Sequence, residues 1–163
     1  MSPEPLFLIH LVLGYVAWFL CLRIYLWPRL KAMPMIDAQR AIAMLHGFRF
    51  FGLAFVLPGV VGPELPDRFA TFAAYGDFAT GLLALAAVIA VGRRLWFWLF
   101  VIAFNVVGVV DLVDDYILAI LGELPAKAGQ LGSVYWIPIL YVPLLMITHV
   151  AAFYLIATNG RRR

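Results

Sequence analysis

The feature that most constrains this chain is a series of apolar stretches, each close to the length needed to cross a lipid bilayer. A spanning helix takes about 20 mainly apolar residues, because each residue rises ~1.5 Å across a hydrocarbon core of ~30 Å. Five stretches meet or approach this requirement, at residues 6–27, 40–61, 69–91, 95–121 and 134–158. The sequence therefore predicts an all-α integral membrane protein, in which residues 1–163 form a single bundle of five transmembrane helices.

The composition of the chain agrees with this prediction. Apolar residues make up 65% of the sequence and charged residues 13%, whereas water-exposed domains average about 45–50% and about 25%. The single cysteine, Cys21, excludes a disulfide within the chain and a zinc or iron–sulfur site built from cysteines. The first apolar stretch is long enough to span and lacks a preceding basic region, so we expect a membrane helix there rather than a cleaved signal peptide.

Charged residues flank the apolar stretches unevenly, and this predicts the orientation of the bundle. With five spans, three basic groups fall on one side: Arg23, Arg29, Lys31 and Arg40; Arg93 and Arg94; and Arg161 to Arg163. The other side carries Glu4, Glu64, Asp67, Arg68, Glu123 and Lys127. The positive-inside rule then places the N-terminus outside and the C-terminus in the cytoplasm of a multi-pass protein of the bacterial inner membrane. The net charge of +3 is thus explained by orientation, and we expect no nucleic-acid partner.

Ionisable residues inside a span are costly and mark candidate sites. In the half near the cytoplasm these are His46, Arg49 and His149, of which His46 and Arg49 share one helix face because they are three residues apart. The two histidines could ligate a b-type haem or another metal, with Arg49 neutralising a haem propionate. Alternatively, they line a pocket for an organic ligand. In the simplest interpretation the histidines only hydrogen-bond neighbouring groups, while Arg49 extends to phosphate headgroups.

A second group of ionisable residues falls in the outer half of the predicted bundle, namely His10, Asp77, Asp111, Asp114 and Asp115. The last three carboxylates lie at positions i, i+3 and i+4 of one helix and must be paired, protonated or bound to a cation. His10 and Asp111 could form a catalytic acid/base pair. However, residues 95–113 already suffice to span, which would leave Asp114 and Asp115 in the solvated headgroup region.

Four segments resemble small bacterial multi-span membrane proteins of uncharacterised function, namely residues 45–52, 74–77, 104–112 and 137–149. This resemblance covers most of the chain and implies no particular activity. The Tyr-x-Pro-Leu-Leu pattern from Tyr141 to Leu145, together with chain length and helix number, is similar to the sterol-isomerase-like EXPERA proteins. That resemblance implies an intramembrane pocket for sterols or related amphiphiles, and no acidic or histidine residue is carried over from it.

The leading hypothesis is a pocket within the bundle for a small hydrophobic or amphipathic molecule, lined by His46, Arg49, Asp77, Asn105, Asp111 and His149. In this hypothesis Arg49 fixes an anionic or polar head, the two histidines hydrogen-bond it, and apolar walls enclose the rest.

Three alternatives remain open at the level of sequence. The protein could be a redox protein with haem or metal at His46 and His149, or an intramembrane isomerase or hydrolase that uses His10 and Asp111. It could also be a structural subunit whose polar residues only hold helices together. A buried serine nucleophile is excluded, because Ser2 and Ser133 are the two serines and both lie outside the predicted spans. The lipid bilayer is the expected partner in every case, and the short chain is compatible with a homodimer.

Overall fold

A computed structural model describes residues 2–159, and every regular element within that range is helical. The α-helices are α1 (Pro3–Cys21), α2 (Trp27–Ala32), α3 (Met35–His46), α4 (Asp67–Ile89), α5 (Arg94–Leu121) and α6 (Val142–Asn159). Two π-helices, η1 (Leu22–Leu26) and η5 (Ile137–Tyr141), and three 3₁₀-helices, η2 (Gly47–Val56), η3 (Ala90–Gly92) and η4 (Ala128–Val134), complete the described elements. The predicted basic tail, Arg161 to Arg163, lies outside the described residues.

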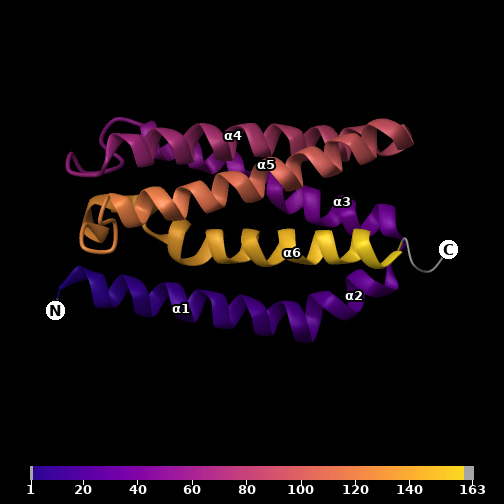
Figure 1. The fold of residues 1–163 in the computed structure, drawn as a ribbon, viewed down its shortest axis with the longest axis horizontal. Coiled ribbons are helices and arrows are strands. Elements are labelled where there is room, and N and C mark those ends of the chain that lie inside the picture. The colour runs from indigo at the N-terminus through magenta and orange to yellow at the C-terminus, as the bar shows by residue number, and fades with distance from the viewer. Residues whose placement is uncertain (1, 160–163) are drawn as a thin grey trace.

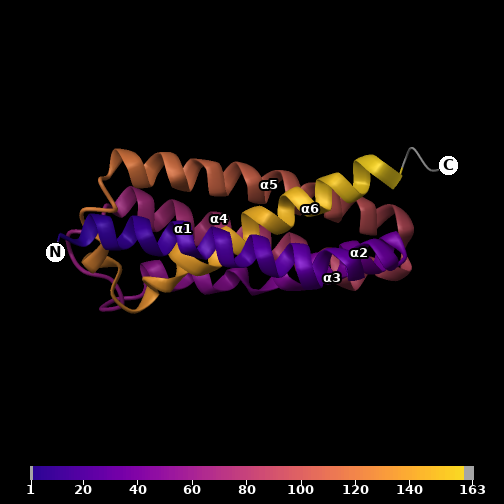
Figure 2. The same cartoon turned by 90° about the horizontal axis from the view of Figure 1, so that it is seen from below.

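The helices lie side by side along one long axis, and the chain reverses direction at the two ends of the bundle (Figure 1; Figure 2). One end, here called the loop end, contains the start of α1 and the connections at residues 57–66 and 122–136. The opposite end, here called the turn end, contains the short connections at residues 33–34 and 92–93 and the end of α6. This arrangement gathers short turns at one end and longer loops at the other.

Within residues 2–159, four helical stretches are long and apolar enough to cross a membrane: Pro3–Ala32, Asp67–Gly92, Arg94–Leu121 and Ile137–Thr158. They correspond to four of the five predicted spans. The all-helical prediction is therefore confirmed for the described residues, and the length and apolar composition of these helices are compatible with a membrane protein.

The remaining predicted span, at residues 40–61, takes the form of a mixed helix. Helix α3 covers 12 residues and the 3₁₀-helix η2 adds ten more, ending where Leu57 is extended just before Pro58. At ~1.5 Å per α-helical and ~2.0 Å per 3₁₀ residue, the two together measure about 38 Å. A 3₁₀-helix longer than about four residues is uncommon. Its narrow turns bring Gly52 against α4, where a Cβ at that position would overlap the side chain of Asp77.

The first helix extends past the point where the sequence predicts its end. The prediction closes the span at Trp27 because Pro28 follows, yet the helix continues to Ala32. The π-helix η1 explains the difference, because the Trp27 amide bonds to the Leu22 carbonyl just before the proline. Pro28 then occupies the first turn of α2, where a missing amide hydrogen costs little.

The interior is divided into two apolar clusters with a polar layer between them. One cluster, towards the loop end, includes Phe55, Ala73, Leu112 and Leu145. The other, towards the turn end, includes Ile42, Ala84, Phe104 and Ala152. On each of the four helical segments that carry these residues, a buried polar side chain lies between the two clusters: Arg49, Asp77, Asn105 and His149. The fold thus positions polar groups from four segments at one level of the bundle.

Candidate functional site

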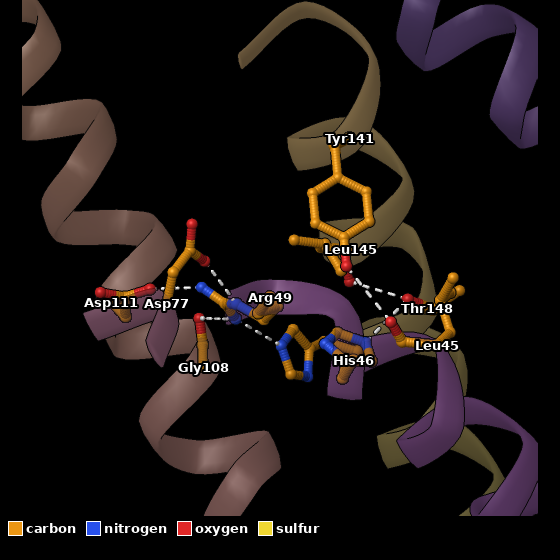
Figure 3. A network of polar contacts seen from close by, with 10 residues as sticks. Leu45, His46, Arg49, Asp77, Gly108, Asp111, Tyr141, Leu145 and Thr148 are labelled. Carbon is orange, nitrogen blue, oxygen red and sulfur yellow. Dashed lines mark hydrogen bonds and ion pairs between the residues drawn. The ribbon is translucent and has the colours of Figure 1, made fainter. Parts of the chain in front are cut away.

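The guanidinium of Arg49 is at the centre of this polar layer (Figure 3). The Arg49 side chain is 0% exposed. Its Nε donates to Asp77 Oδ1 at 2.6 Å, and its Nη2 donates to Asp111 Oδ2. Its Nη1 donates longer bonds, each 3.4 Å, to the Gly108 carbonyl and to His149 Nε2. Every nitrogen of the guanidinium therefore has a partner within the bundle, as a buried arginine requires.

The two carboxylates that bind Arg49 come from neighbouring helices that approach closely. Asp77 lies in the middle of α4 and Asp111 in the second half of α5, and both are buried. Gly76 makes this approach feasible, because a Cβ on Gly76 would overlap the carboxylate of Asp111. In segment 74–77, Asp77 thus follows directly after Gly76, the residue whose lack of a side chain leaves room for Asp111.

The two histidines extend the network on the other side of Arg49. His149 Nδ1 donates to Asn105 Oδ1 at 2.9 Å, since Asn105 Nδ2 already donates to the Val101 carbonyl. His46 Nε2 donates to Thr148 Oγ1 at 3.0 Å, since the Thr148 hydroxyl itself donates to the Leu144 carbonyl. His46 Nδ1 is buried and has no partner among the described residues.

The contact between the two imidazoles bears on the haem and metal hypotheses. The ring centroids of His46 and His149 are 4.0 Å apart, with an interplanar angle of 44°. Two axial ligands of a haem iron lie on opposite faces of the porphyrin, and rings in direct contact leave no room for it between them. Among residues 2–159, moreover, no group of three or more histidine, cysteine or acidic side chains converges as metal ligands. The haem and metal hypotheses stay predictions.

The six predicted ligand-binding residues form one connected cluster rather than two separate groups. His46, Arg49, Asp77, Asn105, Asp111 and His149 are all buried, and Arg49 contacts residues of both predicted groups. The sequence prediction placed these residues in two different halves of the bundle. It treated each span as a straight α-helix and estimated the depth of each residue from the ends of its own span. The first helix is longer than its predicted span, α3 begins five residues before the predicted start at residue 40, and η2 rises more per residue than an α-helix does.

His10 lies away from this cluster. Its Nδ1 is 2.9 Å from the Tyr135 hydroxyl near the loop end, and the contact is exposed. The structure thus does not bring His10 and Asp111 together as an acid/base pair. Either the Tyr135 hydroxyl or the imidazole donates in this bond, depending on the tautomer of His10.

An apolar cavity adjoins the acidic side of the cluster. It has a volume of about 230 Å³, and its walls come from α1, η2, α4, α5, η5 and α6. Asp77 and Asp115 are the acidic residues in its lining, which otherwise includes Phe7, Phe55, Phe69, Leu124 and Val142. Asp115 is 9% exposed, and its Oδ1 has no hydrogen-bond partner. The length of residues 95–113 predicted that Asp115 would be solvated beyond the end of the span. In the structure α5 continues to Leu121, and Asp115 is buried.

The sequence interpretation named Thr148 only as a hydroxyl that the histidines could hydrogen-bond, and the structure shows this bond to His46. Gly108 was not singled out, although it lies one helical turn from Asp111. Tyr141, whose hydroxyl donates to the Leu45 carbonyl at 3.2 Å, was noticed only for its place in an apolar pattern. The sequence signal that could have identified Gly108 is its spacing of three residues from Asp111, which places the two on the same face of α5.

Fold and site together describe a helical bundle with helices long and apolar enough to span a membrane and a buried charged cluster at its centre. Residues 6–157 match a family described as a domain of unknown function, DUF8737, and the chain belongs to this family. No curated protein and no solved structure matches the chain significantly. The resemblance to EXPERA proteins therefore stays a prediction.

Proposed function

We propose that this protein binds a small hydrophobic or amphipathic molecule inside the membrane, in the cavity that adjoins Asp77 and Asp115. The observation that best supports this proposal is the cavity itself, which has apolar walls and the two buried carboxyl groups of Asp77 and Asp115. Ligand sites are typically concave and mainly apolar, with a few polar groups that orient the ligand. A cavity of about 150 Å³ in another protein accepts benzene, so about 230 Å³ accommodates a small ring or one end of a longer amphiphile.

In this proposal Arg49 has a different role from the one expected from the sequence. Its three guanidinium nitrogens are engaged by Asp77, Asp111, Gly108 and His149. Arg49 is thus a positioning residue, which holds Asp77 at the edge of the cavity. The ligand itself meets the carboxylates and the apolar walls.

We further propose five membrane passes, with the N-terminus outside and the C-terminus in the cytoplasm of the bacterial inner membrane. The length of about 38 Å for α3 and η2 together supports the fifth pass, because it exceeds a hydrocarbon core of ~30 Å. The orientation is supported by Arg29 and Lys31 beside one turn-end connection and by Arg93 and Arg94 at the other.

Native mass spectrometry of protein extracted in a mild detergent tests the binding proposal. We expect the wild type to retain a bound mass, and Ala73→Leu to lose it because Ala73 lines the cavity. The matched control is Ala79→Leu, on the same helix but exposed and outside the cavity lining. Bound mass that survives Ala73→Leu, or its absence from folded wild type, would contradict the proposal and favour a purely structural subunit.

A further inference from the structure

We propose that the polar head of the ligand is cationic, and specifically a protonated amine attached to an apolar body. This inference rests on the proposed binding function and names the chemical class that the same cavity selects. It is drawn from the charge balance of the polar layer, from one unpartnered carboxyl group, and from the place where the cavity reaches the surface.

The charge balance of the buried site is negative. Three buried carboxyl groups, those of Asp77, Asp111 and Asp115, accompany the single buried guanidinium of Arg49. Arg49 is bound to Asp77 and Asp111, and it makes no bond to Asp115. When Asp77 and Asp111 are both ionised, two carboxylates share one positive charge even with Asp115 neutral. An anionic head placed here would meet like charge, whereas a cation would be attracted.

Among the described residues, no protein donor reaches Asp115 Oδ1 in the acidic wall of the cavity, whereas Asp77 is bound by Arg49. Asp115 follows Asp111 by one helical turn, and its side chain lines the cavity with an Oδ1 that is buried and without a partner. A carboxyl oxygen that is removed from water without a hydrogen bond is costly. The N–H groups of Arg49 and His149 are bonded to other members of the network. An occupant of the cavity with an N–H or O–H group would supply this donor.

An ammonium group fits this requirement better than other heads. It is a compact positive charge with three N–H donors and no acceptor, so it presents nothing that the carboxyl groups would repel. An alcohol offers a donor but no charge, and a carboxylate or phosphate offers no donor at all when ionised. The bond from an ammonium to a carboxylate is charge-assisted and correspondingly strong.

The surface around the cavity supports entry from the membrane. Leu8 on α1 and Ile120 on α5 both line the cavity, yet they are 44% and 72% exposed. The cavity thus reaches the apolar surface of the bundle at Leu8 and Ile120. An amphiphile that enters there would place its charged head against Asp115 and Asp77 while its hydrocarbon part contacts Phe7, Phe55 and Phe69.

A matched series of probes tests the head group. Dodecylamine, dodecanol and dodecanoate share one chain and differ only in the head, and each is added to the protein in phosphatidylcholine nanodiscs. Binding is measured by native mass spectrometry and by the rise in thermal unfolding temperature. We expect dodecylamine to bind best, and Asp115→Asn to weaken its binding on the order of tenfold to a hundredfold because a charge-assisted bond is lost.

Asp114→Asn is the control, because it removes the same charge from the neighbouring residue, which does not line the cavity. Weaker dodecylamine binding in Asp115→Asn but not in Asp114→Asn supports the proposal. If dodecanol or dodecanoate binds as well as the amine, and Asp115→Asn has no effect, the cationic head is refuted while the cavity proposal stands. If no probe binds, and Ala73→Leu behaves as wild type, the proposed function itself fails.

Discussion

Arg49 Nε lies 2.6 Å from Asp77 Oδ1 in the interior of the bundle, and the two side chains are 0% and 4% exposed. This ion pair joins η2 to α4, and the same guanidinium also binds Asp111 on α5. Breaking a buried pair on one side leaves an uncompensated charge, which costs far more than removing both partners together. The relationship therefore makes specific predictions about stability.

Arg49→Met should destabilise the protein by about 3–5 kcal/mol, because Asp77 and Asp111 would be left without their cation. The free energy of unfolding in mixed detergent micelles measures this loss. The control is Arg68→Met, an exposed arginine at the start of α4, which should change stability by less than about 0.5 kcal/mol.

The triple variant Arg49→Met, Asp77→Asn, Asp111→Asn should be more stable than Arg49→Met alone, since the carboxylates no longer need a cation. A triple variant as unstable as the sum of its parts would argue against the ion-pair account. In that case the three side chains would contribute through packing rather than charge.

Gly108→Ala tests the tight packing of the polar layer. A Cβ at Gly108 would lie 2.5 Å from His149 Nε2 and 2.7 Å from Arg49 Nη1, so the network would have to shift. We expect a loss of about 1–3 kcal/mol, typical of overpacking. Gly92→Ala is the matched control, because a Cβ there meets no atom within 4 Å. Equal effects of the two substitutions would contradict the packing described for α5.

Much of the fold follows from the sequence, because apolar length reports directly on membrane helices. The limits at Pro28 and in the segment 40–61 were harder to predict, since a π-helix and a 3₁₀-helix change the rise per residue without an obvious signal. The six site residues were identified by the cost of polar groups at depth. Their pairing could not be inferred, because it depends on how the helices rotate and slide against one another.

The hydrogen bond between the Tyr15 and Tyr116 hydroxyls, 2.7 Å long, links α1 to α5 beside the cavity. A double-mutant cycle with Tyr15→Phe and Tyr116→Phe should give a coupling free energy of about 0.5–1.5 kcal/mol. Unfolding in mixed micelles provides the measurement. Additive effects of the two substitutions would show that the bond does not contribute to stability.

The proposed topology predicts which ends of the bundle are reached from outside the cell. In a Cys21→Ala background, Pro63→Cys at the loop end should react with a membrane-impermeant maleimide in intact cells. Gly92→Cys at the turn end should react only after the membrane is permeabilised. Both positions are exposed, so burial does not limit labelling. Labelling of Gly92→Cys in intact cells would reverse the proposed orientation or change the number of passes.

Photo-crosslinking with a diazirine-bearing long-chain amine tests the central claim most directly, because it reports where a membrane amphiphile resides. The probe is applied to the protein in nanodiscs, and the modified peptides are mapped by mass spectrometry. The account predicts labels on α1 near Leu8 and on α5 near Ile120, reduced by excess dodecylamine and by Ala73→Leu. Labels spread over the lipid-facing surface and unaffected by either competitor or substitution would show that the cavity is not a binding site.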